Sequence, residues 1–141
     1  MSKVAVVFWS GTGNTEIMAN SVVEGVKKAG KDVDLFTAAE FSASKAEEYD
    51  RIAFGCPSMG AEVLEEAEFE PMYTEVETKI SGKKVALFGS YGWGDGQWMR
   101  EWQERAEGKG AILVDEGLIV NETPDDEGKA LCVALGEKLG A

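Results

Sequence analysis

A chain of 141 residues with 14 Lys and Arg, 26 Asp and Glu and no His has a formal net charge of -12 at pH 7. This length suits one hydrophobic core, so we expect residues 1–141 to form a single domain. The negative charge argues against nucleic acid and anionic membranes as partners, because both are recognised through clustered Lys and Arg. Without imidazole, the chain cannot build a Ser-His-Asp or Cys-His catalytic site.

The two cysteines lie far apart in the sequence and form no CxxC motif, so Cys56 and Cys132 are expected to be reduced thiols. No apolar run approaches the ~20 residues of a membrane span. The chain begins with a strand-like pattern rather than a signal peptide. These features predict a cytoplasmic protein.

The first half of the chain alternates between strand-like and helix-like patterns. An apolar run predicts a strand over 4–8, and apolar residues at helical spacing predict a helix that ends near Gly30. A second strand is predicted over 33–36 and a third over 52–55. The polar stretch 38–50 between them is expected to hold one short helical turn.

The second half continues this alternation. A helix is predicted over 69–80 and a strand over 85–88, followed by a third helix that is capped by Asp95. A fifth strand over 112–120 is interrupted at residues 115–117.

The last helix is expected to open at Thr123-Pro124 and to turn a row of leucines inward, namely Leu131, Leu135 and Leu139. Five strands that alternate with helices predict an α/β fold with three layers, in which helices cover both faces of a doubly wound parallel sheet. Ligands of such sheets bind beyond the carboxyl ends of the strands.

The loop after the first strand, residues 9–15, has a composition typical of a phosphate site. Its glycines let the backbone approach a ligand, the following helix offers free N–H groups, and Ser10, Thr12, Asn14 and Thr15 add side-chain donors. The loop has no Lys or Arg, and it lacks the Gly-Lys-Ser/Thr ending of a nucleotide triphosphatase and the third glycine of a dinucleotide fingerprint. The alternative is a glycine-rich turn before an ordinary helix.

Two further loops follow the third and fourth strands. In residues 56–62, Met59 offers a polarizable surface for a flat ring, although this loop taken alone is better explained as a turn with a core-filling Met. In residues 90–96, Trp93 stands between two glycines and is a candidate to stack on an aromatic ligand. Together the three loops predict a site for a mononucleotide with a large flat ring. Trp9 could belong to the loop packing or to this site.

Three segments resemble those of a known family. W-S-G-T-G-N-T at 9–15, G-C-P-S-M-G at 55–60 and G-S-Y-G-W-G-D-G at 89–96 resemble the loops of short-chain flavodoxins, which are FMN-binding electron carriers. The resemblance covers essentially the whole chain. It implies a flavodoxin-like sheet with strand order 2-1-3-4-5 and FMN as the cofactor.

The resemblance also implies a role for each loop. Residues 10–15 would hold the FMN phosphate with help from Ser58 or Ser90, while Met59 and Trp93 would sandwich the isoalloxazine ring. The phosphate would then be held by neutral donors and by the helix dipole alone.

The second loop would also respond to reduction. A backbone carbonyl at Gly60 would turn to accept a hydrogen bond from flavin N5–H and so stabilise the neutral semiquinone. Glu62 would contact the N3 side of the ring, and N–H groups near Gly92 would contact N1 and O2. Ala61 departs from the polar residue or Gly that is common in the family, and an Ala is less free than Gly to adopt positive φ. The residues expected to bind FMN are Ser10, Gly11, Thr12, Gly13, Asn14, Thr15, Ser58, Met59, Gly60, Ala61, Glu62, Ser90, Tyr91, Gly92, Trp93, Gly94 and Asp95.

A run of glutamates without any Lys or Arg comprises Glu62, Glu65, Glu66, Glu68, Glu70, Glu75 and Glu77. It is expected to be a solvated helix face, and part of it is expected to border the flavin. A negative charge ~10 Å from an added electron costs about 1–2 kcal/mol at an effective dielectric constant of ~20, which lowers a potential by tens of millivolts. The same charges would steer basic patches of reductases and acceptor enzymes toward the site.

The sequence thus predicts a monomeric, low-potential one-electron carrier that cycles mainly between semiquinone and hydroquinone and has no substrate turnover of its own. The main alternative is a flavoenzyme of the same fold, a quinone or NAD(P)H reductase, but no second Gly-rich loop or Arg cluster is present for the nicotinamide nucleotide. A phospho-accepting receiver domain would need carboxylates where Phe8-Trp9-Ser10 and Gly55-Cys56-Pro57 stand. The third alternative is a structural domain without flavin.

Overall fold

A computed structural model describes residues 3–60 and 62–141 of the chain. In the labels below, η marks a 3₁₀ helix. The elements in chain order are β1 (Lys3–Phe8), α1 (Asn14–Lys28), β2 (Asp32–Thr37), η1 (Ala38–Glu40), α2 (Ala43–Ala46), β3 (Arg51–Gly55), α3 (Phe69–Val76), η2 (Glu77–Lys79), β4 (Lys84–Tyr91), α4 (Gln97–Gly108), β5 (Ile112–Leu113), β6 (Leu118–Asn121) and α5 (Asp126–Gly140).

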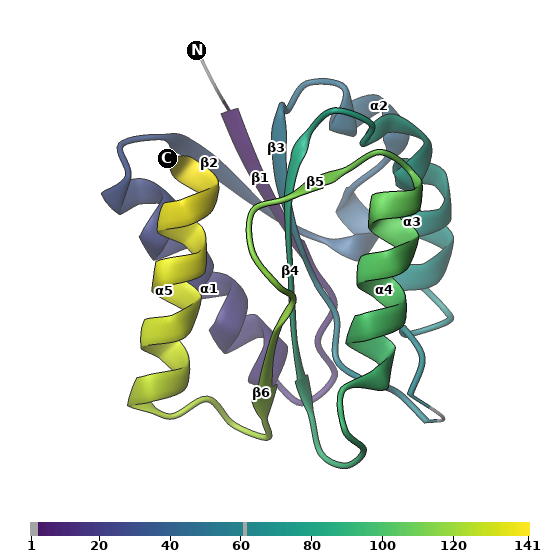
Figure 1. The fold of residues 1–141 in the computed structure, drawn as a ribbon, viewed down its shortest axis with the longest axis vertical. Helices are drawn as coiled ribbons and strands as arrows, with labels where there is room; N and C mark the ends of the chain where they lie inside the picture. The colour runs from purple at the N-terminus through teal and green to yellow at the C-terminus, as the bar shows by residue number, and fades with distance from the viewer. Residues whose placement is uncertain (1–2, 61) are drawn as a thin grey trace.

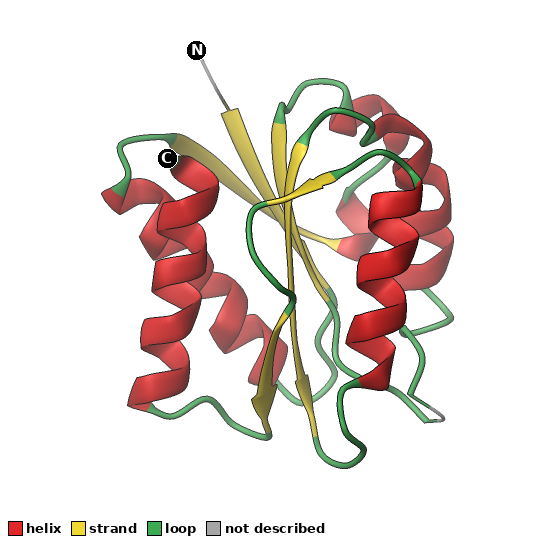
Figure 2. Cartoon of the chain, in the orientation of Figure 1, coloured by secondary structure: helices red, strands yellow, loops and turns green. Residues whose placement is uncertain are grey.

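The strands form one parallel sheet in the order β2-β1-β3-β4, with the fifth position shared by two short strands. β5 pairs with the first residues of β4, and β6 pairs with its last four residues. Helices α1 and α5 cover one face of the sheet, and α2, α3 and α4 cover the other (Figures 1 and 2). The predicted three-layer fold and strand order 2-1-3-4-5 are confirmed.

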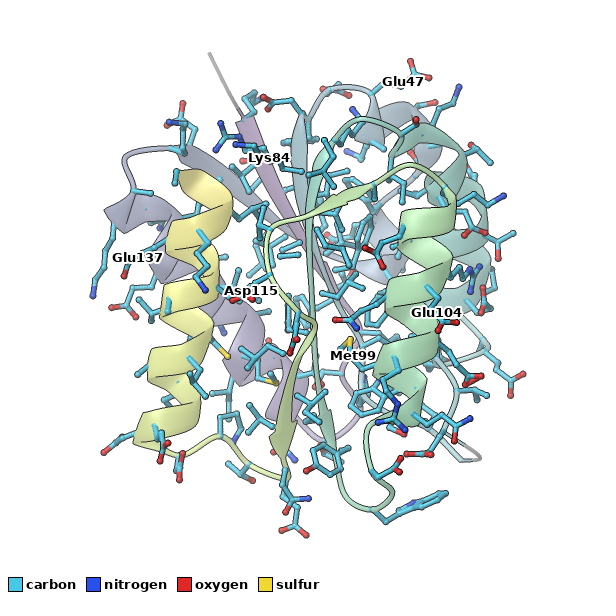
Figure 3. The ribbon with its side chains drawn as sticks, viewed as in Figure 1. Glu47, Lys84, Met99, Glu104, Asp115 and Glu137 are labelled. Carbon is cyan, nitrogen blue, oxygen red and sulfur yellow. The ribbon has the colours of Figure 1, made fainter. Side chains whose placement is uncertain are left out.

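The interruption of the fifth strand has a steric cause. The segment between β5 and β6 passes so close to α4 that a Cβ atom on Gly117 would collide with the side chain of Met99. The Gly117 N–H also donates to the side-chain oxygen of Gln103, which holds the segment on α4. Figure 3 shows Met99 pointing from α4 toward the sheet, whereas Glu104 lies on the outer side of the helix.

Each face of the sheet has its own hydrophobic core. Along β1, Val4 and Val6 pack on the α1/α5 side, while Ala5 and Val7 pack on the side of α3 and α4. This alternation explains why β1 reads as an unbroken apolar run, since both of its faces are buried. The two thiols are divided in the same way, with Cys56 in one core and Cys132 in the other, and both are free.

Three local predictions about helix ends and faces were wrong. Asp95 does not cap α4, because the cap position is Gly96 in the left-handed conformation and the Asp95 carboxylate accepts from Arg100 instead. Helix α5 does not open at Thr123-Pro124 but is capped by Asp125, whose carboxylate accepts the Gly128 N–H. Leu131 is 49% exposed, because the buried row of α5 consists of Gly128, Cys132, Leu135, Gly136, Leu139 and Gly140.

Among the described residues, no helix combines the length and the apolar character that crossing a bilayer requires.

Candidate functional site

The carboxyl ends of the strands meet the loops at one end of the sheet, at the bottom of Figure 2. Here the three predicted loops enclose an open pocket of about 250 Å³. The pocket is lined by eight of the residues expected from the sequence, namely Gly11, Thr12, Asn14, Ser58, Met59, Ser90, Tyr91 and Gly92. Trp9, which the sequence left open between loop packing and this site, also lines the pocket, and so do Pro57 and Glu122, which were not predicted.

The first loop presents the start of α1 to the pocket. Gly13 occupies the helix cap with φ of 96°, a left-handed conformation that glycine adopts without a steric penalty. The Ser10 hydroxyl accepts the N–H groups of Gly13 and Glu16, at 3.1 and 3.3 Å. Ser10 therefore folds the loop, and it is Gly11, Thr12 and Asn14 that line the pocket. A helix start with neutral donors favours an anionic ligand.

Hydrogen bonds tie the three loops together beside the pocket. The hydroxyls of Thr15 and Ser90, both buried, lie 3.1 Å apart and share a hydrogen bond, and the Ser90 N–H donates to the Thr15 hydroxyl at 3.4 Å. The carbonyl of Ser90 accepts the N–H of Ser58 at 3.0 Å. Thr15 does not line the pocket, so its hydroxyl fixes the position of Ser90, which does.

The second loop contains a tight turn at the pocket. Met59 and Val63 exchange two backbone hydrogen bonds of 2.9 and 3.0 Å, which close the turn between them. Gly60 has φ of 46° and Glu62 has φ of 58°, an uncommon conformation for a residue with a side chain. The predicted contribution of Ala61 lies outside the described residues.

Glu65 anchors the far end of this turn, a role that the sequence did not reveal. Its buried carboxylate accepts the N–H groups of Ala67, Glu68 and Phe69, each at 2.8 Å. Burial opposes the charge, but these three donors outweigh it and hold the pKa of Glu65 below its ordinary value. The Glu65 N–H in turn donates to the Cys56 sulfur at 3.4 Å, and burial raises the pKa of that thiol. Glu65 is thus an internal anchor rather than part of a solvated face.

The third loop carries Trp93 directly after Gly92, which lines the pocket. Trp93 is 62% exposed and does not line the pocket. Glu62 joins the second loop to the third, because its carboxylate accepts the Asp95 N–H at 3.2 Å. The predicted residues Ser10, Gly13, Thr15, Gly60, Glu62, Trp93, Gly94 and Asp95 belong to these loops but do not line the pocket.

Trp9 belongs to the site as well as to the loop packing. It lines the pocket, and its indole N–H donates to the Glu68 carboxylate at 3.0 Å. Trp9 also separates the pocket from a neighbouring hollow that is lined by Glu16 and Glu68 among other residues. The residues after β6 form the remaining wall, where the Glu122 N–H donates to the Tyr91 carbonyl at 2.8 Å.

Comparisons with known proteins give the family. A family model described as flavodoxin matches residues 6–136. The chain belongs to the flavodoxin family. It is 50% identical over 134 residues to a flavodoxin from Clostridium beijerinckii, a match that covers 95% of this chain and 96% of the relative. It is 47% identical over 134 residues to a flavodoxin from Megasphaera elsdenii, with the same coverage.

Solved flavodoxin structures have the same fold. The solution structure of two-electron reduced Megasphaera elsdenii flavodoxin aligns with a TM-score of 0.89 at 44% identity and covers 97% of this chain and 98% of that one. An archaeal flavodoxin aligns with a TM-score of 0.89 at 26% identity, over 98% and 96% of the two chains. The chain is an FMN-binding electron carrier of this family.

The pocket fits FMN in its chemistry. One side offers Thr12, Asn14 and the start of α1, all neutral donors suited to a phosphate. Met59 and Tyr91 supply apolar and aromatic surface suited to a flat ring.

Proposed function

We propose that the chain is a low-potential one-electron carrier that holds the FMN phosphate at Gly11, Thr12 and Asn14, with the flavin ring between Met59 and Trp93. The observation that carries this proposal is the pocket, in which neutral donors and ring-binding surface from three separate loops converge. When bound, FMN supplies the redox chemistry, since its ring takes up and releases electrons. The chain binds the flavin, orients it and limits the access of water.

Carboxylates around the pocket support a low potential. Glu122 lines the pocket, Glu68 is held beside it by Trp9, and Glu62 lies on the turn that follows Met59. Each negative charge disfavours the addition of further negative charge to a bound flavin, by about 1–2 kcal/mol at ~10 Å and an effective dielectric constant of ~20. These glutamates therefore favour the oxidised over the fully reduced state.

A potentiometric titration under anaerobic conditions tests this proposal. We expect two resolved one-electron steps, the second at a clearly lower potential than for free FMN. A single two-electron step would contradict one-electron carriage, and the FMN pocket would then fit a flavoenzyme instead. In the same preparation, we expect no steady-state oxidation of NADH or NADPH without an added partner, because the chain is proposed to lack substrate turnover.

The charge distribution supports docking of basic partner proteins at the pocket. Acidic side chains gather at this end, where Glu16 and Glu68 line the hollow beside Trp9. Lys27 and Lys28 in the last turn of α1 lie away from this end, and so does Lys84, which Figure 3 shows far from these loops. We propose that a monomer presents its acidic end, and with it the flavin, to reductases and acceptor enzymes. We also propose a cytoplasmic location and a single domain over residues 1–141.

Ionic strength should therefore change how fast partners are reduced. We expect the second-order rate constant with a basic acceptor such as cytochrome c to fall by about tenfold or more between low salt and several hundred millimolar salt. Stopped-flow absorbance measures this rate. A neutral one-electron acceptor serves as the control and should show no such fall. Equal salt dependence for both acceptors would contradict electrostatic docking.

A further inference from the structure

The loop between β6 and α5 contacts the proposed phosphate site through one side chain. The Thr123 hydroxyl donates a hydrogen bond of 3.0 Å to Oδ1 of Asn14, a residue 109 positions earlier in the chain. Asn14 is the first residue of α1 and lines the pocket. We propose that Thr123 is a positioning residue for FMN, because it orients the Asn14 amide so that its N–H₂ group faces the phosphate. This inference rests on the phosphate placement proposed above.

The chemistry of the amide explains why its orientation matters. A carboxamide presents either an oxygen, which accepts hydrogen bonds, or an N–H₂ group, which donates two. A phosphate carries negative charge and offers acceptor oxygens, so it attracts the N–H₂ group and repels the oxygen. The hydroxyl of Thr123 binds the oxygen of Asn14. Both hydrogens on Nδ2 are thereby left for the pocket.

The orientation of neutral donors matters for phosphate binding in this chain. No Lys or Arg occurs between Lys3 and Lys27, so the loop itself supplies no cation to a phosphate. Binding must rely on backbone N–H groups, hydroxyls and the Asn14 amide. A misoriented amide would place a partial negative charge beside the anion, and no positive side chain of the same loop would offset it.

Thr123 is held in place from both sides. Before it, the Glu122 N–H donates to the Tyr91 carbonyl at 2.8 Å, and Glu122 adopts φ of 56°. After it stands Pro124, which is buried and restricts Thr123 to extended conformations. Asp125 then caps α5 through the Gly128 N–H at 2.8 Å. The hydroxyl is therefore presented to Asn14 by a loop that is fixed on β4 and on α5.

The affinities of FMN and riboflavin test this role, because riboflavin has the same ring without the phosphate. Fluorescence titration of the apoprotein gives both dissociation constants. Thr123→Val should raise the dissociation constant of FMN about five-fold, which is the effect of losing one net hydrogen bond. The dissociation constant of riboflavin should stay within about twofold of the wild-type value. Thr123→Ser keeps the hydroxyl and should restore the FMN affinity. Thermal unfolding of the three apoproteins should coincide, because the side chain of Thr123 is exposed.

A double-mutant cycle separates this role from a general structural one. Asn14→Ala should reduce the preference for FMN over riboflavin, and Thr123→Val should have no further effect in that background. Equal weakening of both flavins, no weakening of FMN, or a loss that persists in the Asn14→Ala background would overturn the positioning role. An unchanged flavin preference in Asn14→Ala alone would instead overturn the proposed phosphate placement.

Discussion

Replacing Arg105 with methionine should lower the free energy of unfolding by about 3 kcal/mol, because it leaves two carboxylates facing each other without their shared cation. Arg105 of α4 donates to both oxygens of Glu70 at 2.7 and 2.8 Å and to both oxygens of Glu77 at 2.8 and 3.0 Å. Its guanidinium also lies 4.9 Å from the ring centre of Tyr73. The Glu77 side chain is only 9% exposed, so water could solvate its carboxylate only weakly once the hydrogen bonds from Arg105 are lost.

Urea unfolding of the wild type and two variants measures this effect. The matched control is Arg100→Met. Arg100 lies on α4 like Arg105, and this change breaks its ion pair with Asp95. The side chains of that pair are 57% and 76% exposed, so its loss should cost at most about 1 kcal/mol. A cost for Arg105→Met as small as that of the control would show that the cluster does not join α3 and η2 to α4.

The cluster of Arg105, Glu70 and Glu77 should also affect how the free energy of unfolding depends on pH. The hydrogen bonds from Arg105 hold the pKa of Glu70 below its usual value. A carboxyl whose pKa is lower in the folded state contributes stability above its unfolded pKa of ~4.3 and loses that contribution as the pH falls toward the folded value. The wild type should therefore lose stability below about pH 4.5, and Arg105→Met should lose less over the same range. Parallel pH profiles would contradict the pairing.

The fold could be predicted because its main signals are local. Apolar runs such as 4–8 and 85–88 are typical of strands that are buried on both faces, and amphipathic segments between them are typical of covering helices. Helix ends were less predictable, because Asp95 and Thr123-Pro124 have residue types that are common at helix starts, whereas the path of the chain places the caps at Gly96 and Asp125. The split of the fifth strand depends on the contact of Gly117 with Met99, which no local pattern contains.

The site was predictable where its composition is unusual. Glycines interleaved with hydroxyls marked residues 9–15, and an isolated Trp marked residues 90–96. The part of the wall formed by Glu122 was missed because a short polar loop before a helix has no distinctive pattern. The glutamate run was misread in part, because Glu65 and Glu77 are buried while Glu66 and Glu68 are exposed. A glutamate that binds backbone N–H groups and a glutamate that faces water are the same residue type, so the sequence alone does not distinguish them.

Replacing Trp93 with alanine should weaken the binding free energy of FMN by about 1–3 kcal/mol, by analogy with the stacking of bases on aromatic side chains. Trp93 is 62% exposed, so a ring bound beside it would bury indole surface that now faces water. Its neighbours Gly92 and Gly94 contribute no side chains, and Gly94 has φ of 89°, which a residue with a Cβ rarely adopts. The two neighbouring residues of the loop therefore leave the indole uncovered.

The loss in Trp93→Ala should be equal for FMN and riboflavin, because stacking involves the ring that both flavins share. This distinguishes Trp93 from Thr123, whose loss should affect FMN alone. Trp93→Phe keeps an aromatic face and should recover most of the affinity. The unfolding midpoint of the apoprotein should not change, since an exposed side chain contributes little to stability. Unchanged dissociation constants would remove Trp93 from the ring site, and a loss for FMN alone would place its contact at the phosphate instead.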